Sequence, residues 1–312
     1  MDLARFYREA DTLSREKPIH IIHAHDLYAA AMALIARKAY EYKVVVDYSP
    51  VLKPLASKNG DNPEDVLPQW GPRALELLEK WVIQNVSHTI VETRTAARYL
   101  KSRYLLSAER LSVIPNCADA AIFRYDATAR ELIRAQLGLA YRLIVTHAGD
   151  IVNQDIDTMV TVFRNLLEQQ PAAHFLSLTC SAHSVREYLS DRLPQGTFSV
   201  VSPTAESLPA YLSVSDLGFV LPKPCATLQA LSPALFAQFL NCGVPVIISS
   251  DVGDFSNLVR HKMIGNILKD FMVSNYFIRA VVRSRDEMAQ RCIQEGRSLT
   301  WQHQQDISKY VF

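Results

Sequence analysis

Residues 232–250, SPALFAQFLNCGVPVIISS, decide the fold of this chain because they join a short amphipathic helix to a buried strand. Apolar side chains recur along residues 234–240 one, three and four positions apart, which is the spacing of a helix that packs on a sheet. Gly243 can adopt the left-handed conformation that ends a helix, and Pro245 prevents the helix from continuing. The β-branched run around Pro245 predicts a parallel strand that is covered on both faces. The stretch thus predicts one step of a doubly wound sheet, in which ligands bind at the carboxyl ends of the strands.

The length and composition are those of a globular protein with two domains. The 312 residues exceed the size, roughly 250–300 residues, at which a single hydrophobic core stops growing. The 33 basic and 32 acidic side chains nearly cancel, so the charge does not favour a nucleic-acid partner. No apolar run is long enough for a membrane span, and the polar start does not resemble a signal peptide. The five cysteines show no paired metal spacing, which favours a reducing, cytoplasmic compartment.

Strands and helices alternate along the chain, which predicts an α/β protein built from βαβ units with mainly parallel sheets. Strands are expected at residues 19–23, 43–47, 88–91, 110–114, 143–148, 173–178, 197–201, 217–221 and 244–249. Helices are expected at residues 27–40, 70–85, 93–103, 157–169 and 207–214, and the tail from 271 to 312 is expected to be mostly helical. We therefore expect two Rossmann-like domains, residues 1–125 and 126–312. A polar loop over residues 49–68 is long enough to be mobile or functional.

The first helix, expected over residues 2–16, is amphipathic. Its apolar side chains are Leu3, Phe6, Tyr7 and Leu13, and its basic ones include Arg5, Arg8 and Arg15. Two interpretations stay open: a helix that packs on the protein surface, or a basic helix that contacts the inner face of a membrane as a peripheral anchor.

Two motifs resemble the retaining glycosyltransferases of family 4, which have the GT-B fold. Cys242-Gly243-Val244-Pro245 follows its helix as the Cys-Gly-x-Pro motif does in that family, and Pro115-Asn116-Cys117-Ala118-Asp119 with Phe123 resembles the loop that closes the first domain. The helix before Asp216 resembles a third family element, and the resemblance spans about residues 18–270. It implies the transfer of a sugar, with retention, from a nucleotide-sugar donor to a glycan or lipid acceptor, without a cofactor.

The start of the chain departs from the family pattern. The first domain of the family opens with a strand, a glycine-rich loop and a further βα unit, all before a turn like His23-Ala24-His25-Asp26. This sequence begins at about the helix that precedes that turn. We therefore expect a first domain truncated at its amino end, with a sheet edge that the first helix or a protein partner covers.

The resemblance also implies a set of donor-binding residues, several of them altered. Gln238 stands where the family places a glutamate for the donor ribose, and Ala230 stands at a second family glutamate. Glutamine can still form hydrogen bonds, but not the stronger ones of a carboxylate. The loop 150–157 is acidic where the family has cations for the donor diphosphate, which leaves Lys223 as the best candidate cation. The expected donor-binding residues are His147, Gly149, Lys223, Ser232 and Gln238, with Ser181 and His183 as weaker candidates.

The first domain holds the expected catalytic and acceptor-side residues. Asp47 and Ser49 follow a buried strand, and Ser49 stands where many relatives have a histidine near the reacting sugar carbon. Alternatively, both residues form only the turn before Pro50. His23 and His25 share one face at a strand end, where two imidazoles could bind a metal or relay a proton. No third ligand stands at a recognisable spacing, so no metal site is expected.

Three functional hypotheses follow. The first is a retaining glycosyltransferase. The second is a catalytically inactive GT-B module that acts as a partner or fragment of a transferase, because Ser49, Gln238 and Ala230 replace residues that the chemistry needs. A sugar-nucleotide epimerase is disfavoured, because its acid and base residues are not identifiable in this sequence.

Overall fold

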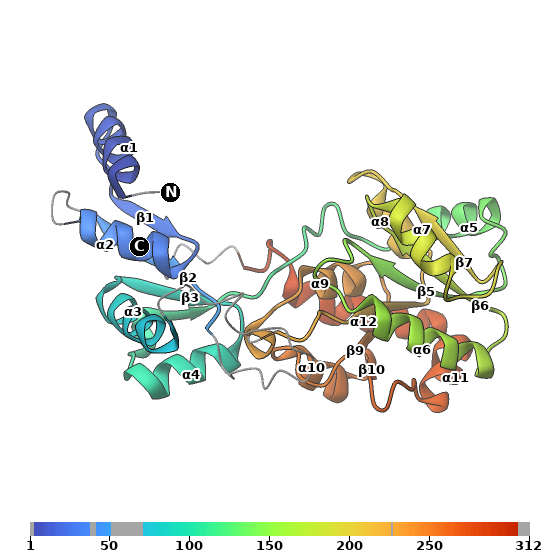
Figure 1. Ribbon diagram of the computed structural model, residues 1–312. Helices are drawn as coiled ribbons and strands as arrows, with labels where there is room; N and C mark the ends of the chain where they lie inside the picture. Colours follow the sequence, from blue (N-terminus) through green and yellow to red (C-terminus); the bar gives the residue numbers. More distant parts are fainter. Residues whose placement is uncertain (1–2, 38–41, 51–70, 226, 305–312) are drawn as a thin grey trace. The chain divides into compact units, whose positions relative to one another are not determined.

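The computed structural model describes residues 3–37, 42–50, 71–225 and 227–304, which fold into two compact units. The first unit runs from Met1 to Pro115 and includes Cys225–Leu231, and the second comprises Asn116–Pro224 and Ser232–Gln305. The chain thus divides after Pro115 rather than after residue 125. Most of the expected loop 49–68, and the end of the expected helical tail, lie outside the described residues. Within each unit, helices flank a parallel sheet (Figure 1).

The sheet of the first unit has four parallel strands in the order β1-β2-β3-β4. They are β1 (Ile21–Ala24), β2 (Lys43–Asp47), β3 (His88–Val91) and β4 (Leu111–Val113), and the helices are α1 (Leu3–Glu16), α2 (Leu27–Ala36), α3 (Gly71–Asn85) and α4 (Arg94–Tyr104). Asp26 begins α2, since its Oδ1 accepts a hydrogen bond of 2.7 Å from the N–H of Ala29. Within the described part of the sheet, β1 is an edge strand.

Helix α1 packs on its own unit. Phe6 lies against the hydrophobic core of the first unit, and on the exposed side Arg5 pairs with Glu9 at 2.9 Å. Leu13 remains 56% exposed. The Phe6 contact favours the interpretation of α1 as a packed surface helix. Among the described residues, no helix has the length and apolar character needed to cross a membrane.

The sheet of the second unit has six parallel strands in the order β10-β9-β8-β5-β6-β7. They are β5 (Leu143–Ala148), β6 (Ala173–Leu178), β7 (Phe198–Val201), β8 (Leu217–Val220), β9 (Val246–Ile248) and β10 (Gly265–Ile267). The helices are α5 (Ala127–Gln136), α6 (Ile156–Gln169), α7 (Ala182–Ser190), α8 (Leu208–Ser213), α9 (Ala234–Asn241), α10 (Phe255–Lys262), α11 (Asn275–Arg283) and α12 (Arg285–Gly296). The chain builds outward from β5 to β7 and then returns to build from β8 to β10. The strand order therefore reverses between β5 and β8, which is the topological switch point of a doubly wound sheet.

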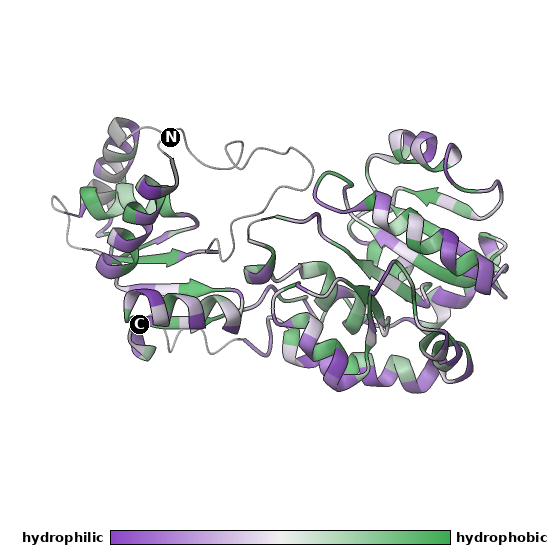
Figure 2. Cartoon of the chain, turned by 60° about the horizontal axis from the view of Figure 1, so that its bottom comes forward, coloured by the Kyte–Doolittle hydropathy of each residue, from purple (hydrophilic) through white to green (hydrophobic). Residues whose placement is uncertain are grey.

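The hydrophobic pattern explains both the sheet and its covering helices. Every residue of β5 and β6 is buried, as expected for parallel strands covered on both faces. In Figure 2 the strands are mostly hydrophobic, whereas the helices carry both hydrophobic and hydrophilic faces. The stretch 232–250 forms α9 and β9, and Gly243 ends the helix with φ +71°. These features confirm the α/β prediction.

Asp216 is a buried anchor at the amino end of β8, where three arginines from two helices surround it. Arg130 of α5 pairs with its carboxylate directly, Arg134 lies 3.2 Å from Oδ2, and Arg285 of α12 lies 3.6 Å from Oδ1. Oδ2 also accepts a hydrogen bond of 2.8 Å from the backbone N–H of Ile144, at the start of β5. Asp216 therefore ties two strands to two helices through charge-assisted contacts.

Candidate functional site

The loops that follow β5 and β8 pair with each other at the switch point of the second unit. The N–H of Asp155 donates to the carbonyl of Leu221 at 2.9 Å, and the N–H of Lys223 donates to the carbonyl of Asn153 at 3.0 Å. Gln154 and Pro222 form an antiparallel bridge between these bonds. The backbone of Lys223 is thereby held beside the loop 150–157, which contains no basic residue, and its side chain is exposed. This is the crevice in which doubly wound proteins bind their ligands.

Gly149 begins the first of these loops, and the loop itself requires a glycine there. Its φ is +106°, and an added Cβ would lie 2.8 Å from Nε2 of Gln154. That nitrogen donates to the carbonyl of Ala148 at 2.7 Å, while the N–H of Gly149 donates to Leu178 of β6. A side chain at Gly149 would therefore displace Gln154 and disturb the pairing with the 221–223 segment.

The acidic side chains of this loop are partly used by the fold. Asp155 is the N-cap of α6, and it accepts hydrogen bonds from the N–H of Thr158 at 3.1 Å and from its hydroxyl at 2.7 Å. The hydroxyl of Tyr188 donates to Asp157. Asp150 remains exposed. Two of the carboxylates that make the loop acidic are therefore directed at neighbouring helices.

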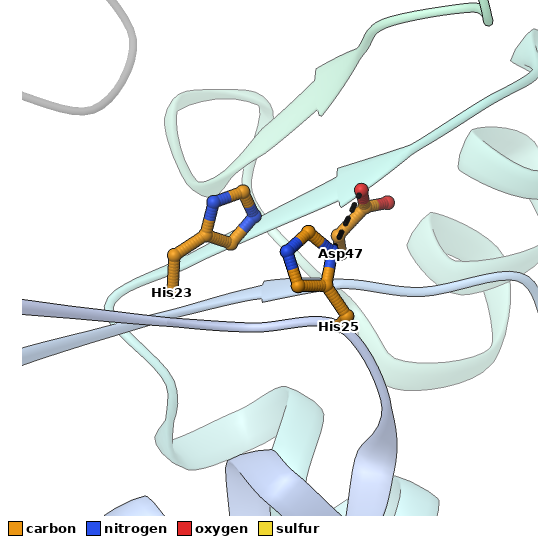
Figure 3. Close-up of side chains that lie close together, drawn as sticks. All are labelled: His23, His25 and Asp47. Atoms are coloured by element: carbon orange, nitrogen blue, oxygen red, sulfur yellow. Dashed lines mark ion pairs between the residues drawn. The ribbon is translucent and has the colours of Figure 1, made fainter.

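In the first unit, His23, His25 and Asp47 lie together at the carboxyl ends of β1 and β2 (Figure 3). The two imidazole rings have centroids 4.8 Å apart, and Nδ1 of His25 lies 3.8 Å from Oδ2 of Asp47. Burial, reinforced by the neighbouring His25, lowers the pKa of His23. The sequence shows no third ligand at a recognisable spacing, and the strand pairing brings Asp47 to the two histidines as a potential one. Ser49 follows at two residues' distance and is half-buried.

A buried carboxylate holds the chain just after Asp47. Tyr48 donates its hydroxyl to Oε1 of Glu79 at 2.9 Å, and Tyr104 donates to Oε2 at 2.5 Å. Burial raises the pKa of Glu79, while the two tyrosines act in the opposite direction. Tyr48, between Asp47 and Ser49, is thus held by Glu79 of α3, which also binds Tyr104 of α4.

The comparisons with known proteins agree with this architecture. Residues 1–117 match the glycosyl transferase 4-like domain. The chain is 24% identical over 307 residues to the D-inositol 3-phosphate glycosyltransferase of Nocardia farcinica, an alignment that covers 91% of this chain and 64% of the relative. By these similarities the chain resembles the GT-B glycosyltransferases of family 4. With 64% of the relative covered, the chain spans less than two thirds of the length of that curated relative.

Solved structures share the GT-B fold with this chain. Sucrose-phosphate synthase of Thermosynechococcus elongatus aligns with a TM-score of 0.71 and 18% identity, over 96% of this chain and 75% of that one. HepE of Anabaena, in complex with UDP-glucose, aligns with a TM-score of 0.70 and 15% identity, over 100% of this chain and 84% of that one. At these identities the similarity establishes the fold.

His147 lies inside the second unit rather than at an open face. Its side chain has no exposed surface, and its Nδ1 lies 2.9 Å from the hydroxyl of Ser177 on the adjacent strand. The expectation that His147 lines the donor site is therefore not supported by its position, and we assign the ring to the core.

Acidification from about pH 6.5 to pH 4 should destabilise the protein through two buried histidines. Burial lowers the pKa of both His147 and His174 to about 4. Because an unfolded histidine titrates near 6.5, the unfolded chain binds more protons in this window. The free energy of unfolding should therefore decrease as the pH is lowered, by at most about 1.4 kcal/mol per pH unit for each histidine. Urea denaturation at several pH values measures this slope.

His174→Asn is the matched variant for that measurement, because it removes one of the two titrating rings. Nε2 of His174 lies 2.9 Å from the hydroxyl of Ser199, a contact that an amide can reproduce. The slope should become shallower in the variant, whatever its stability at neutral pH. Glu79, whose pKa burial raises, acts with the opposite sign in both proteins. An unchanged slope would contradict the role of the buried ring.

Ser232 is a structural contact rather than an open donor-binding group. It is buried, its hydroxyl accepts a hydrogen bond of 2.8 Å from the N–H of Asn116, and its carbonyl accepts one of 2.8 Å from the Asn116 amide. The Pro115-Asn116 motif is thus pinned to the residues that precede α9.

The two altered glutamate positions have different surroundings. Gln238 lies half-buried on α9, and within the described chain its amide has no hydrogen-bond partner. Ala230 is fully buried in the hydrophobic core of the first unit, in a segment with no room for solvent around its side chain. Gln238 is therefore available to a ligand, whereas Ala230 is not. His183, in turn, is exposed and lies 3.4 Å from Glu187 on its own helix.

Proposed function

We propose that this protein binds a nucleotide-sugar donor in its second unit and transfers the sugar, with retention, to a glycan or lipid acceptor. The observation that carries the proposal is the pairing of the β5 and β8 loops at the switch point, which fixes Lys223 where a donor diphosphate would need a cation. The complex of the similar HepE with UDP-glucose supports a donor of this class. We further propose that the protein works in the cytoplasm and that the donor site needs no cofactor.

The proposed roles follow from charge and position. Lys223 stabilises the negative charge that develops on the departing diphosphate, in the way fixed cations stabilise leaving groups in preorganised sites. Gln238 hydrogen-bonds the donor ribose through its free amide. On the first unit, Asp47 and Ser49 are the proposed catalytic residues. His23 and His25 are proposed to lie on the side that binds the acceptor.

A catalytically inactive GT-B module remains the second candidate function. A specific observation favours it: Ala230 is closed into a core, so the contact made by the second family glutamate cannot form from this position. Such a module would serve as the partner of a competent transferase. It could still bind a nucleotide in its second unit without turnover.

A thermal-shift titration of the purified chain with UDP, GDP and ADP and their sugar conjugates tests the proposal. A nucleotide present at 100 times its Kd should stabilise the fold by about 2.7 kcal/mol, a shift that is readily visible. Release of free nucleotide from the sugar conjugate then separates the two candidates. Binding with release supports the transferase, and binding without release supports the inactive module. If no nucleotide raises the melting temperature, the donor-binding proposal is wrong.

Gln238→Glu should increase the affinity for the donor nucleotide. A carboxylate accepts charge-assisted hydrogen bonds from ribose hydroxyls, which are stronger than those of an amide by about 1 kcal/mol, or roughly fivefold in Kd. Calorimetric titration with the nucleotide found by thermal shift measures the change. Gln290→Glu is the control, since Gln290 is exposed on α12 and the variant adds the same charge. Equal effects of both variants would point to net charge rather than to a ribose contact.

A further inference from the structure

The parallel pairing of β1 and β2 brings three potential metal ligands to one point on the first unit. The register pairs His23 with Val45 and Ala24 with Val46, so that His25 and Asp47 are the next pair. Residues two apart on a strand point to the same face, which places His23 beside His25. Figure 3 shows the three side chains converging from the ends of the two strands. Neither strand alone contains the set, which is why the sequence did not reveal it.

The distances suit a small cation after modest side-chain rotation. One ligand atom from each of the three residues lies within 4.8 Å of the other two. In a tetrahedral zinc site with bonds of about 2.0–2.1 Å, neighbouring ligand atoms are about 3.4 Å apart. The His25 to Asp47 separation of 3.8 Å is already close to this value. Both histidines are exposed at their tips, so their rings can turn without disturbing the core.

The backbone that carries these ligands is well fixed. β2 is paired on both sides, by β1 and by β3, and Tyr48 is bonded to the buried Glu79 immediately after Asp47. On the other strand, Asp26 caps α2 directly after His25. Ligands mounted on rigid element ends lose little further backbone freedom when they bind an ion.

Within the part of the chain that the structure describes, the three side chains form no hydrogen bonds. Within the described chain, no ring nitrogen of His23 or His25 takes part in a hydrogen bond, and the contact of His25 with Asp47 is longer than one. An exposed ion pair of this kind contributes little to stability. The two tilted imidazole rings and the carboxylate are thus not held in place by other described side chains and can turn toward an ion.

We propose that His23, His25 and Asp47 bind one divalent transition-metal ion, with the remaining coordination position open to water or to an oxygen ligand. Two imidazoles and one carboxylate form a donor set suited to zinc, cobalt or nickel rather than to magnesium or calcium. The site lies entirely within the first unit, and it does not depend on nucleotide binding in the second.

Calorimetric titration of the whole chain with zinc chloride tests the proposal. The unaltered protein should bind one ion per chain at this site, and His25→Ala and Asp47→Asn should each weaken the binding at least about tenfold. Circular dichroism without metal should show that both variants keep the fold, since the side chains are partly or largely exposed. A titration with cobalt should show visible absorption of a nitrogen and oxygen site, which is lost in the same two variants.

Two control variants distinguish this site from other surface ligands. Cys180 and His183 are exposed on the second unit, and Cys180→Ser and His183→Ala should leave zinc binding unchanged. The proposal is overturned if the unaltered chain shows no saturable binding, or if His25→Ala and Asp47→Asn bind as it does. It is also overturned if Cys180→Ser or His183→Ala abolishes the binding. None of these results bears on the nucleotide site, which is tested separately with UDP.

Discussion

Asp216→Asn should lower the free energy of unfolding by about 3–5 kcal/mol, because it leaves three largely buried arginine side chains without their counter-charge. Arg285 already has buried guanidinium nitrogens without a hydrogen-bond partner, and burial lowers its pKa and that of Arg134. Removing the carboxylate would add repulsion among cations that have little access to water. Urea denaturation at neutral pH measures the loss as a lower midpoint with an unchanged slope.

Two variants show whether the effect belongs to the charge cluster. Arg134→Met should cost less than Asp216→Asn, since Arg130 and Arg285 still compensate the carboxylate. Asp251→Asn, at an exposed aspartate with a single hydrogen bond of 3.4 Å from Ser250, should change stability by no more than about 0.5 kcal/mol. A small effect of Asp216→Asn, comparable with that of Asp251→Asn, would show that the cluster is not a stabilising anchor.

Lys223→Ala should reduce turnover of the nucleotide sugar by about 100- to 1000-fold, which corresponds to about 2.7–4 kcal/mol of transition-state stabilisation. The loop should keep its shape, because Lys223 is fixed through its backbone N–H to Asn153 and not through its side chain. The loss should appear mainly in kcat, since the diphosphate gains its charge as the sugar departs. Release of free nucleotide under saturating donor measures it.

Lys223→Arg and Lys262→Ala complete that experiment. Lys223→Arg keeps the positive charge and should retain part of the turnover, although guanidinium and ammonium groups differ in geometry. Lys262→Ala removes an exposed lysine that pairs with Glu295 at 3.0 Å on the same unit, and it should leave turnover unchanged. Full activity of Lys223→Ala would remove Lys223 from the proposed mechanism and leave the diphosphate without an assigned cation.

The sequence predicted the larger elements well where apolar residues form continuous or periodic runs. The strands 43–47, 88–91, 143–148 and 173–178 have the predicted bounds, and α9, β9 and the turn at Gly243 follow the pattern of residues 232–250. The short elements α7, α10 and β10 were not predicted. Their segments mix polar and apolar residues over only a few positions, so local periodicity is too weak to identify them.

The candidate sites were predicted in part. Gly149 and Lys223 were singled out separately, and the structure places them on paired loops. His147 and Ser232 were expected to face the donor, but both are buried and bonded to other residues of the fold. A strand end predicts the edge at which a side chain lies, not whether a neighbouring strand covers it. Both residues are buried by contacts with segments distant in sequence, which a local sequence pattern cannot predict.

The sequence by itself indicated the fold class, the run of strands and helices, and the resemblance to the family. Hydrophobic periodicity and turn residues are local, so they can be recognised along the chain. Only the tertiary structure decided that Asp47 joins His23 and His25, that Lys223 lies beside Asn153, and that Asp216 gathers three arginines. Each of these contacts joins segments distant in sequence through strand register or helix packing. Register is fixed when hydrophobic faces are buried together, so such contacts appear only once the chain has folded.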